Sequence, residues 1–328
     1  MKRTLKYILL STVLLLAILC ALIFIPKVLV IKEKITIDAP ARIVFNQIND
    51  FHNWNFWSEL IPDKESAVGY GDGGMGKGGS IVWEDSNGTG IGKYTIISSV
   101  PYKSLEIAMD DKDDGVFSVA RIVLTEIGEK TEVFWELVFK NKGVKSHIFK
   151  FDASGRIRGS LRGLAQVSTL WYEQNIPLVE LGFIDKTPYV SIRRQIPATE
   201  AGVAMGDIFE QLVDIQGKGV FRIAGEPFAI YYSLGEERLD VECGFVVENA
   251  VADFGVAKSG VFAESLCAIV RFSGDYADIE SAHDAIRQWL EDRNFQQNGP
   301  PMETFNNNFL QPAAAEWGIT ICYPFSFE

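Results

Sequence analysis

The sequence predicts an α+β protein in which an N-terminal transmembrane helix precedes two globular domains. Three observations predict this organisation: an apolar run opens the chain, strand-like segments in the middle end in one long helix, and the C-terminal part repeats itself after 78 residues. We place the anchor at residues 1–30, the first domain at 31–182 and the second at 186–328. We expect an antiparallel sheet curled around its helix, followed by a duplicated β-α-β-β unit.

The apolar run at residues 7–25 contains no charged side chain. As a helix it would span about 28 Å, close to the thickness of the hydrocarbon core of a bilayer. Lys2, Arg3 and Lys6 precede it and favour a cytoplasmic N-terminus. A cleaved signal peptide is the alternative, but bulky residues occupy 22–25, where small ones are needed. The sequence therefore predicts a single-pass protein of the cell membrane, held in the lipid bilayer through residues 7–25, with both domains outside the cytoplasm.

The charge of the chain is uneven. Its net charge is −12, and residues 186–328 hold 10 Lys and Arg against 21 Asp and Glu. Nucleic acid is not an expected partner, because its binding needs a basic footprint. An acidic domain favours cationic ligands, although a solvated acidic surface would give the same composition.

The first domain shows period-two alternation, which is typical of half-buried strands. A short helix is expected at 41–49 after Pro40, and a long one at 159–181, which Pro177 should bend or interrupt. Six strands are expected, at residues 28–39, 80–84, 92–100, 104–109, 117–126 and 131–139.

Motifs across this domain resemble those of START-like proteins of the polyketide cyclase/dehydrase (SRPBCC) type. They are Ala39-Pro40-Ala41, Val44-Phe45, Trp54-x-x-Trp57, the segment 78–84, and the segment 131–135. The resemblance implies a helix-grip fold with an apolar cavity between sheet and helix. It does not imply one activity, because this fold hosts carriers, sensors and a few enzymes.

Five tryptophans of the first domain are candidates for the wall of that cavity: Trp54, Trp57, Trp83, Trp135 and Trp171. For each of them, ordinary core packing is the alternative. As a group they predict a pocket for an apolar ligand, and we take Trp54, Trp83, Trp135 and Trp171 as its binding residues.

Two motifs of the first domain imitate known sites. Residues 71–77 have the spacing of a phosphate-binding loop, but Gly78 stands where Ser or Thr is required and a strand is expected to follow. Residues 110–115 hint at a calcium loop, but Lys112 occupies a ligand position. The three histidines also lack metal-ligand spacing, so neither a metal nor a cofactor is predicted.

In the second domain, residues 190–193 match 268–271, and residues 208–212 match 286–290. The match continues from 228–232 to a strand near 306–310, and from 241–243 to 319–321. Each half therefore reads as strand, helix, strand, strand. A groove is expected where the halves meet.

This half of the chain resembles the gyrase-inhibitor-like effector-binding domain, which some AraC- and MerR-type transcription regulators carry. The similarity rests on five segments, 225–232, 240–244, 274–276, 303–305 and 317–324, together with the helix that holds Trp289. The resemblance implies an aromatic groove with buried acids that receives cationic or aromatic small molecules. Some members of that family are hydrolases.

Glu242 and Glu303 are the acids that the resemblance places in the groove, although each could equally be a surface carboxylate. Its expected walls are Tyr231, Tyr232, Phe272, Trp317 and Tyr323. Thr320 stands where the family has Glu, which argues against hydrolysis.

The sequence thus favours a membrane-anchored, non-catalytic protein that binds a small hydrophobic or cationic aromatic ligand. A hydrolase or cyclase-like enzyme using Glu303 or Glu242, and a lipid-handling envelope protein, are the alternatives. No catalytic residue is assigned.

Overall fold

The structure, a computed structural model, describes residues 12, 27–61, 67–84, 91–111, 116–141, 145–235, 237–306 and 317–327. The chain forms two compact units, Met1–Ile176 and Pro177–Glu328. The predicted membrane span at 7–25 lies outside the described residues, apart from Thr12. Among the helices that are described, none is both long and apolar enough to cross a bilayer.

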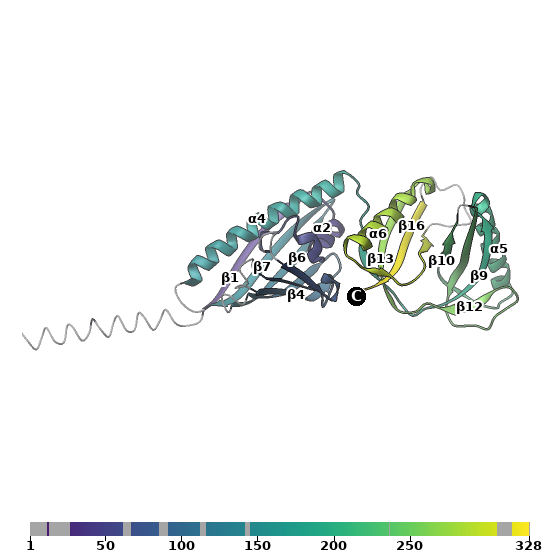
Figure 1. Ribbon diagram of the computed structural model, residues 1–328, viewed down its shortest axis with the longest axis horizontal. Helices are drawn as coiled ribbons and strands as arrows, with labels where there is room; N and C mark the ends of the chain where they lie inside the picture. The colour runs from purple at the N-terminus through teal and green to yellow at the C-terminus, as the bar shows by residue number, and fades with distance from the viewer. Residues whose placement is uncertain are drawn as a thin grey trace, which may run out of the picture. The chain divides into compact units, whose positions relative to one another are not determined.

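The first unit is a seven-stranded antiparallel sheet with a long helix, α4 (Lys145–Glu173), lying along it (Figure 1). The sheet order is β1-β7-β6-β5-β4-β3-β2. Two short helices, α2 (Ala41–Ile48) and α3 (Phe51–Trp54), follow β1. The strands are β1 (Lys27–Ile37), β2 (Ala67–Gly71), β3 (Ser80–Glu84), β4 (Ile91–Val100), β5 (Ser104–Asp111), β6 (Val116–Ile127) and β7 (Lys130–Asn141).

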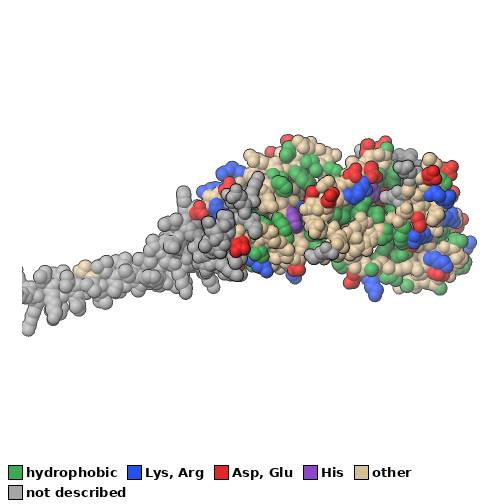
Figure 2. All heavy atoms as spheres, viewed as in Figure 1, with side chains coloured by type: hydrophobic (Ala, Val, Ile, Leu, Met, Phe, Trp, Pro, Cys, Tyr) green, Lys and Arg blue, Asp and Glu red, His purple; other side chains and the backbone are tan. Residues whose placement is uncertain are grey.

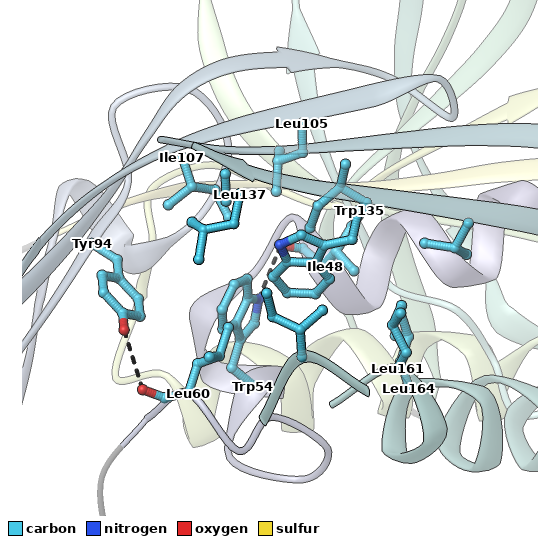
Figure 3. Close-up of a cluster of buried hydrophobic side chains, with 14 of the residues drawn as sticks. Ile48, Trp54, Leu60, Tyr94, Leu105, Ile107, Trp135, Leu137, Leu161 and Leu164 are labelled. Carbon is cyan, nitrogen blue, oxygen red and sulfur yellow. Dashed lines mark hydrogen bonds between the residues drawn. The ribbon is translucent and has the colours of Figure 1, made fainter. Parts of the chain in front are cut away.

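The core of the first unit lies between the sheet and α4. Ile157, Leu161 and Leu164 recur at helical spacing on α4 and are buried. Alternate residues of the strands, such as Leu105 and Ile107, meet them from the sheet (Figure 3). This arrangement, a curled antiparallel sheet that holds one helix, is the one that the alternation predicts.

The long helix differs from its prediction at both ends. It begins at Lys145 rather than near residue 159, and it stops at Glu173 rather than at residue 181. Of the two expected effects of Pro177, interruption is the one that agrees with a helix ending before it. The chain after Pro177 enters the second unit, where β8 (Glu180–Ile184) pairs with β13 (Ser265–Gly274). The boundary between the units therefore precedes the predicted limit at residue 182.

The second unit is a nine-stranded sheet with two helices. Its strand order is β12-β9-β11-β10-β15-β16-β13-β8, and β14 pairs with β16. The helices are α5 (Ala201–Gly217) and α6 (Glu280–Asp292). The other strands are β9 (Pro188–Pro197), β10 (Ile223–Leu234), β11 (Arg238–Val247), β12 (Lys258–Val261), β14 (Gln296–Gln297), β15 (Met302–Phe305) and β16 (Trp317–Ser326).

The predicted β-α-β-β repeat is present: β9-α5-β10-β11 is followed by β13-α6-β15-β16. The predicted equivalence of 228–232 with 306–310 is wrong in register, because β15 ends at Phe305. Ile230 pairs with Glu242, and Thr304 pairs with Thr320, the residue 78 positions after Glu242. In these central strands Ile230 thus corresponds to Thr304.

The repeat includes one further strand on each side, which the sequence pattern does not reveal. β8 precedes the first repeat but pairs with β13 of the second, while β12 precedes the second repeat and pairs with β9 of the first. Gly182 and Gly260 are equivalent positions in these exchanged strands. A Cβ at Gly182 would lie 2.0 Å from the Ile269 side chain, and one at Gly260 would lie 2.3 Å from the Tyr189 side chain, so a larger residue at either position would displace its neighbour.

Both helices of this unit cover the same face of the sheet. The ring of Phe209 on α5 lies 6.2 Å from that of Phe305, and His283 on α6 contacts Glu303, two residues earlier on the same strand. Residues two apart on a strand share a face. We call this the helix face and the opposite one the groove face.

Candidate functional site

A cavity of about 390 Å³ opens on the groove face of the second unit. Its walls are mostly apolar and aromatic, and it contains one acidic side chain, Glu264. Among the described residues that line it, none is basic. The lining residues are Ile184, Tyr189, Ile230, Tyr232, Val261, Phe262, Ala263, Glu264, Ser265, Asn298, Gly299, Pro300, Met302 and Pro324.

A second carboxylate, that of Glu242, lies beside this cavity and is 9% exposed. The hydroxyl of Tyr232, a lining residue, donates a hydrogen bond of 2.6 Å to its Oε2. The hydroxyl of Ser191 donates to Oε1. Because both partners are neutral, these bonds orient the carboxylate without neutralising its charge.

Charges and aromatic rings are coupled around Glu242. Burial and the hydrogen bond to Glu242 raise the pKa of Tyr232, and burial followed by the Glu242 charge raises that of Tyr189. The Arg193 guanidinium lies 3.5 Å from the centre of the Tyr232 ring. It also donates two hydrogen bonds of 2.8 Å to Asp240, which lowers the pKa of that carboxyl. The hydrogen bonds to Asp240, and to a smaller extent the nearby Glu242 charge, raise the pKa of Arg193, so this guanidinium is matched mainly by Asp240.

Glu303 lies in a separate network on the helix face and is 2% exposed. Its Oε2 accepts hydrogen bonds from the hydroxyls of Tyr231 (2.9 Å) and Tyr276 (3.1 Å). Its Oε1 lies 3.1 Å from His283 Nε2, while His283 Nδ1 lies 2.9 Å from the Tyr323 hydroxyl. Each oxygen of Glu303 has a protein partner, as buried carboxylates require.

The predicted groove residues are thus split between two faces. Tyr232 and Glu242 lie together at the cavity, whereas Tyr231, Glu303 and Tyr323 lie under α6. The prediction that all five line one groove is wrong, because neighbouring residues of a strand point to opposite faces.

The remaining two predicted wall residues lie on β13 and β16. Phe272 is half-buried on β13 and does not line the described cavity. Trp317 begins β16, and its side chain lies outside the described part of the structure.

The tryptophans predicted to line a cavity in the first unit pack against each other. The rings of Trp54 and Trp135 lie 6.1 Å apart and both side chains are fully buried (Figure 3). Trp83 is buried against Tyr94, while Trp171, near the end of α4, is half-buried and outside the core. The core-packing alternative therefore describes Trp54, Trp83 and Trp135, and neither alternative describes Trp171.

Among the described residues of the first unit, three buried polar atoms are unsatisfied. Trp135 Nε1 is buried and has no hydrogen-bond partner among the described residues, and the same holds for Gln47 Nε2 and Ser168 Oγ. By contrast, the indole nitrogen of Trp54 donates to the Ile48 carbonyl at 3.0 Å. An unpaired buried donor is costly, so Trp135 offers a hydrogen bond to any acceptor that enters the core.

Sequence reasoning missed several residues of the cavity. Tyr189 and Ser191 lie on either side of Val190 on β9, on the same face as Glu242. The alternation of the strand could have predicted that these two side chains share a face. Glu264 lies on the connection after β12, and no pattern marks it. The three cysteines of this unit, Cys243, Cys267 and Cys322, are buried free thiols.

Residues 29–169 match the family described as polyketide cyclase / dehydrase and lipid transport. This is the family that the motifs of the first domain resemble, and its description fits hydrophobic ligands. The matched residues lie within the first unit, and none belongs to the second. No curated protein matches the chain.

Solved structures similar to parts of the chain include two of EcmrR. EcmrR in a complex with DNA is 17% identical to this chain, with a TM-score of 0.43. The alignment covers 55% of this chain and 70% of the EcmrR chain. The EcmrR C-terminal domain is 20% identical, with a TM-score of 0.40, and the alignment covers 47% of this chain and 99% of that domain. Norcoclaurine synthase from Thalictrum flavum is 14% identical, with a TM-score of 0.36, and the alignment covers 44% of this chain and 95% of the synthase chain.

These likenesses have TM-scores too low to support a functional assignment. DNA binding is stated for EcmrR alone, and the absence of nucleic-acid binding in this chain stays a prediction. On the face drawn in Figure 2, acidic and basic side chains lie interspersed over the surface.

Proposed function

We propose that this chain is a membrane-anchored small-molecule-binding protein whose second unit binds an apolar or aromatic cation. The observation that carries the proposal is Glu242, a nearly buried carboxylate held by two neutral hydroxyls beside an aromatic cavity. A cavity of about 390 Å³ suits one small organic molecule.

The chemistry of the walls favours a cation over an anion or a neutral molecule. A carboxylate removed from water is costly unless a positive charge or enough hydrogen bonds compensate it. A ligand cation supplies that charge, and the rings of Tyr189, Tyr232 and Phe262 add cation–π attraction. The second acid, Glu264, adds negative potential at the same cavity.

The test compares benzyltrimethylammonium with neopentylbenzene, its neutral isostere, by calorimetry on the full chain. We expect the cation alone to bind measurably, and Glu242→Gln to weaken its affinity about 10- to 100-fold, as loss of a desolvated charge partner does. Glu248→Gln removes one charge from an exposed position of the same unit and is the matched control. Equal binding of the two compounds, or unchanged affinity in Glu242→Gln, contradicts the proposal.

For the first unit we propose binding of a hydrophobic molecule that carries a hydrogen-bond acceptor. The family match and the unpaired Trp135 indole support this role. Native mass spectrometry of the purified full chain should detect a bound lipid-like molecule, and Trp135→Phe should reduce its occupancy. A chain that is free of such molecules after mild extraction argues against it.

Anchoring through residues 7–25 is the remaining part of the proposal and rests on the sequence alone. We expect the protein to stay in the membrane fraction after an alkaline carbonate wash. Protease added to intact cells, after removal of the outer envelope layers, should digest both units. Release by carbonate would contradict the anchor.

A further inference from the structure

Two of the three cysteines of the second unit are neighbours on adjacent strands, Cys267 on β13 and Cys322 on β16. The register places Cys267 opposite Pro324, two residues after Cys322, so both thiols lie on the face that Pro324 shares with the cavity. Both side chains are buried. Hydrogen bonding with Cys267, followed by burial, raises the pKa of the Cys322 thiol. The two thiols therefore form a pair on the groove face of the sheet.

A third sulfur side chain belongs to the same group. Met302 on β15 lies directly opposite Cys322 in the register, and the Cβ atoms of directly opposed residues are about 5 Å apart. Met302 also lines the cavity, and so does Pro324, which lies opposite Cys267. The three sulfur donors thus adjoin the wall of the cavity, which gives a small ion a path to them.

The remaining cysteine shows that burial in this sheet does not require a sulfur neighbour. Cys243 on β11 is fully buried, and the residues opposite it on the two adjacent strands are Ala229 and Ile192. It follows Glu242, which faces the cavity, so Cys243 points to the helix face. A buried thiol that only fills space has apolar neighbours of this kind. Cys243 is therefore the internal control for the pair.

The kinds of donor decide which ion suits the group. Zinc takes four ligands, most often from Cys, His, Asp and Glu. In the part of the chain that the structure describes, no group of three or more such side chains is placed to hold a metal ion. Thiolate and thioether donors favour Cu(I) instead, and Cu(I) needs only two or three of them.

We infer that Cys267, Cys322 and Met302 form a binding site for Cu(I) at the wall of the cavity. Each thiol releases its proton to water as its sulfur binds the ion, and the copper stays Cu(I) throughout. The Met302 thioether adds a neutral third donor from the opposite strand. This site is independent of the proposed organic cation, because it uses neither Glu242 nor its hydroxyl partners.

The test offers Cu(I), as its bicinchoninate complex, to the full chain under reducing, oxygen-free conditions. All arms carry Cys20→Ser, since Cys20 is a further thiol outside the described residues. We expect the chain to withdraw one Cu(I) per molecule. Cys322→Ala should weaken the affinity at least about 100-fold, more than the loss of an outer-shell partner costs. Met302→Leu, which conserves side-chain volume, should weaken it about tenfold.

Two controls make the result independent of folding defects. Cys243→Ala removes an equally buried thiol from the other face and should leave the affinity unchanged. X-ray absorption at the copper edge, measured on the chain with all three sulfur residues in place, should show sulfur as the only kind of ligand. This second measurement needs no substitution in the core.

The outcomes bear on the copper site alone. A chain that withdraws no Cu(I), or that binds it through nitrogen or oxygen, overturns the site. Equal losses in Cys243→Ala and Cys322→Ala overturn it as well, because any buried thiol would then serve. Unchanged affinity in Met302→Leu contradicts the three-sulfur site. None of these results affects the organic cation, whose calorimetric test contains no metal.

Discussion

Glu242 and Glu303 are two nearly buried carboxylates on opposite faces of one sheet, and each accepts a hydrogen bond from a tyrosine. Glu242 lies beside a cavity and is held by hydroxyls alone. Glu303 is covered by α6 and engages two tyrosines and His283. The comparison teaches that burial and a tyrosine partner do not identify a ligand site. The adjacent cavity and the hydroxyl-only partners of Glu242 are the observations on which the proposed ligand site rests.

Truncation of the two acids gives the largest expected difference. Glu303→Ala should lower the free energy of unfolding by about 3–5 kcal/mol, because it removes the carboxylate that Tyr231 and His283 contact in the interior. Glu242→Ala should cost about 1 kcal/mol or less, since water in the cavity can replace the lost acceptor. Urea denaturation of both variants measures the difference, and equal losses would remove the distinction.

Removal of the tyrosine hydroxyls should give a smaller difference in stability between the two sites, again with the larger loss at Glu303. Tyr231→Phe deletes a buried donor to Glu303 and should cost about 1–2 kcal/mol. Tyr232 is 41% exposed, so Tyr232→Phe should change stability by less than about 0.5 kcal/mol while weakening ligand binding. A larger stability loss in Tyr232→Phe would show that the groove pair is the structural one.

Alkaline pH should produce the smallest effect. Burial, then the Glu303 charge, raises the pKa of Tyr231 well above its usual value. The unfolded chain therefore loses this proton first, and the stabilisation present below about pH 10 declines as the pH rises further. For one tyrosine the loss amounts to about 0.5 kcal/mol between about pH 10 and 10.5.

The alkaline prediction is measured as the difference between wild type and Tyr231→Phe across that interval, which cancels the titration of the other groups. The stability of Tyr231→Phe should fall less steeply than that of the wild type. Parallel curves would mean that Tyr231 titrates in the folded protein as it does in the unfolded chain.

Alternation and periodicity predicted most of the fold. Six strands of the first unit and the β-α-β-β order of the second could be identified, because buried faces leave a period of two or a repeat in the sequence. β8 and β12 were not predicted, because strands of five and four residues show too little alternation and their partners lie in the opposite repeat.

The candidate site was predicted in part. Glu242 and Tyr232 were assigned to the groove and lie at the cavity. Glu303 was assigned there too, although its neighbour Met302 takes the groove face and turns Glu303 towards α6. A sequence position next to a groove residue cannot settle which face it occupies until the strand register is known.

The exchanged strands β8 and β12 couple the unfolding of the two repeats of the second unit. The strand β8, which precedes the first repeat, pairs with β13 of the second, and β12, which precedes the second repeat, pairs with β9 of the first. Neither repeat can therefore complete its sheet alone. The two halves should therefore unfold as one cooperative body, and no stable half-molecule should accumulate. Because β8 must wait for β13 to be available before it can pair, closure of the sheet belongs among the late and slow events of folding.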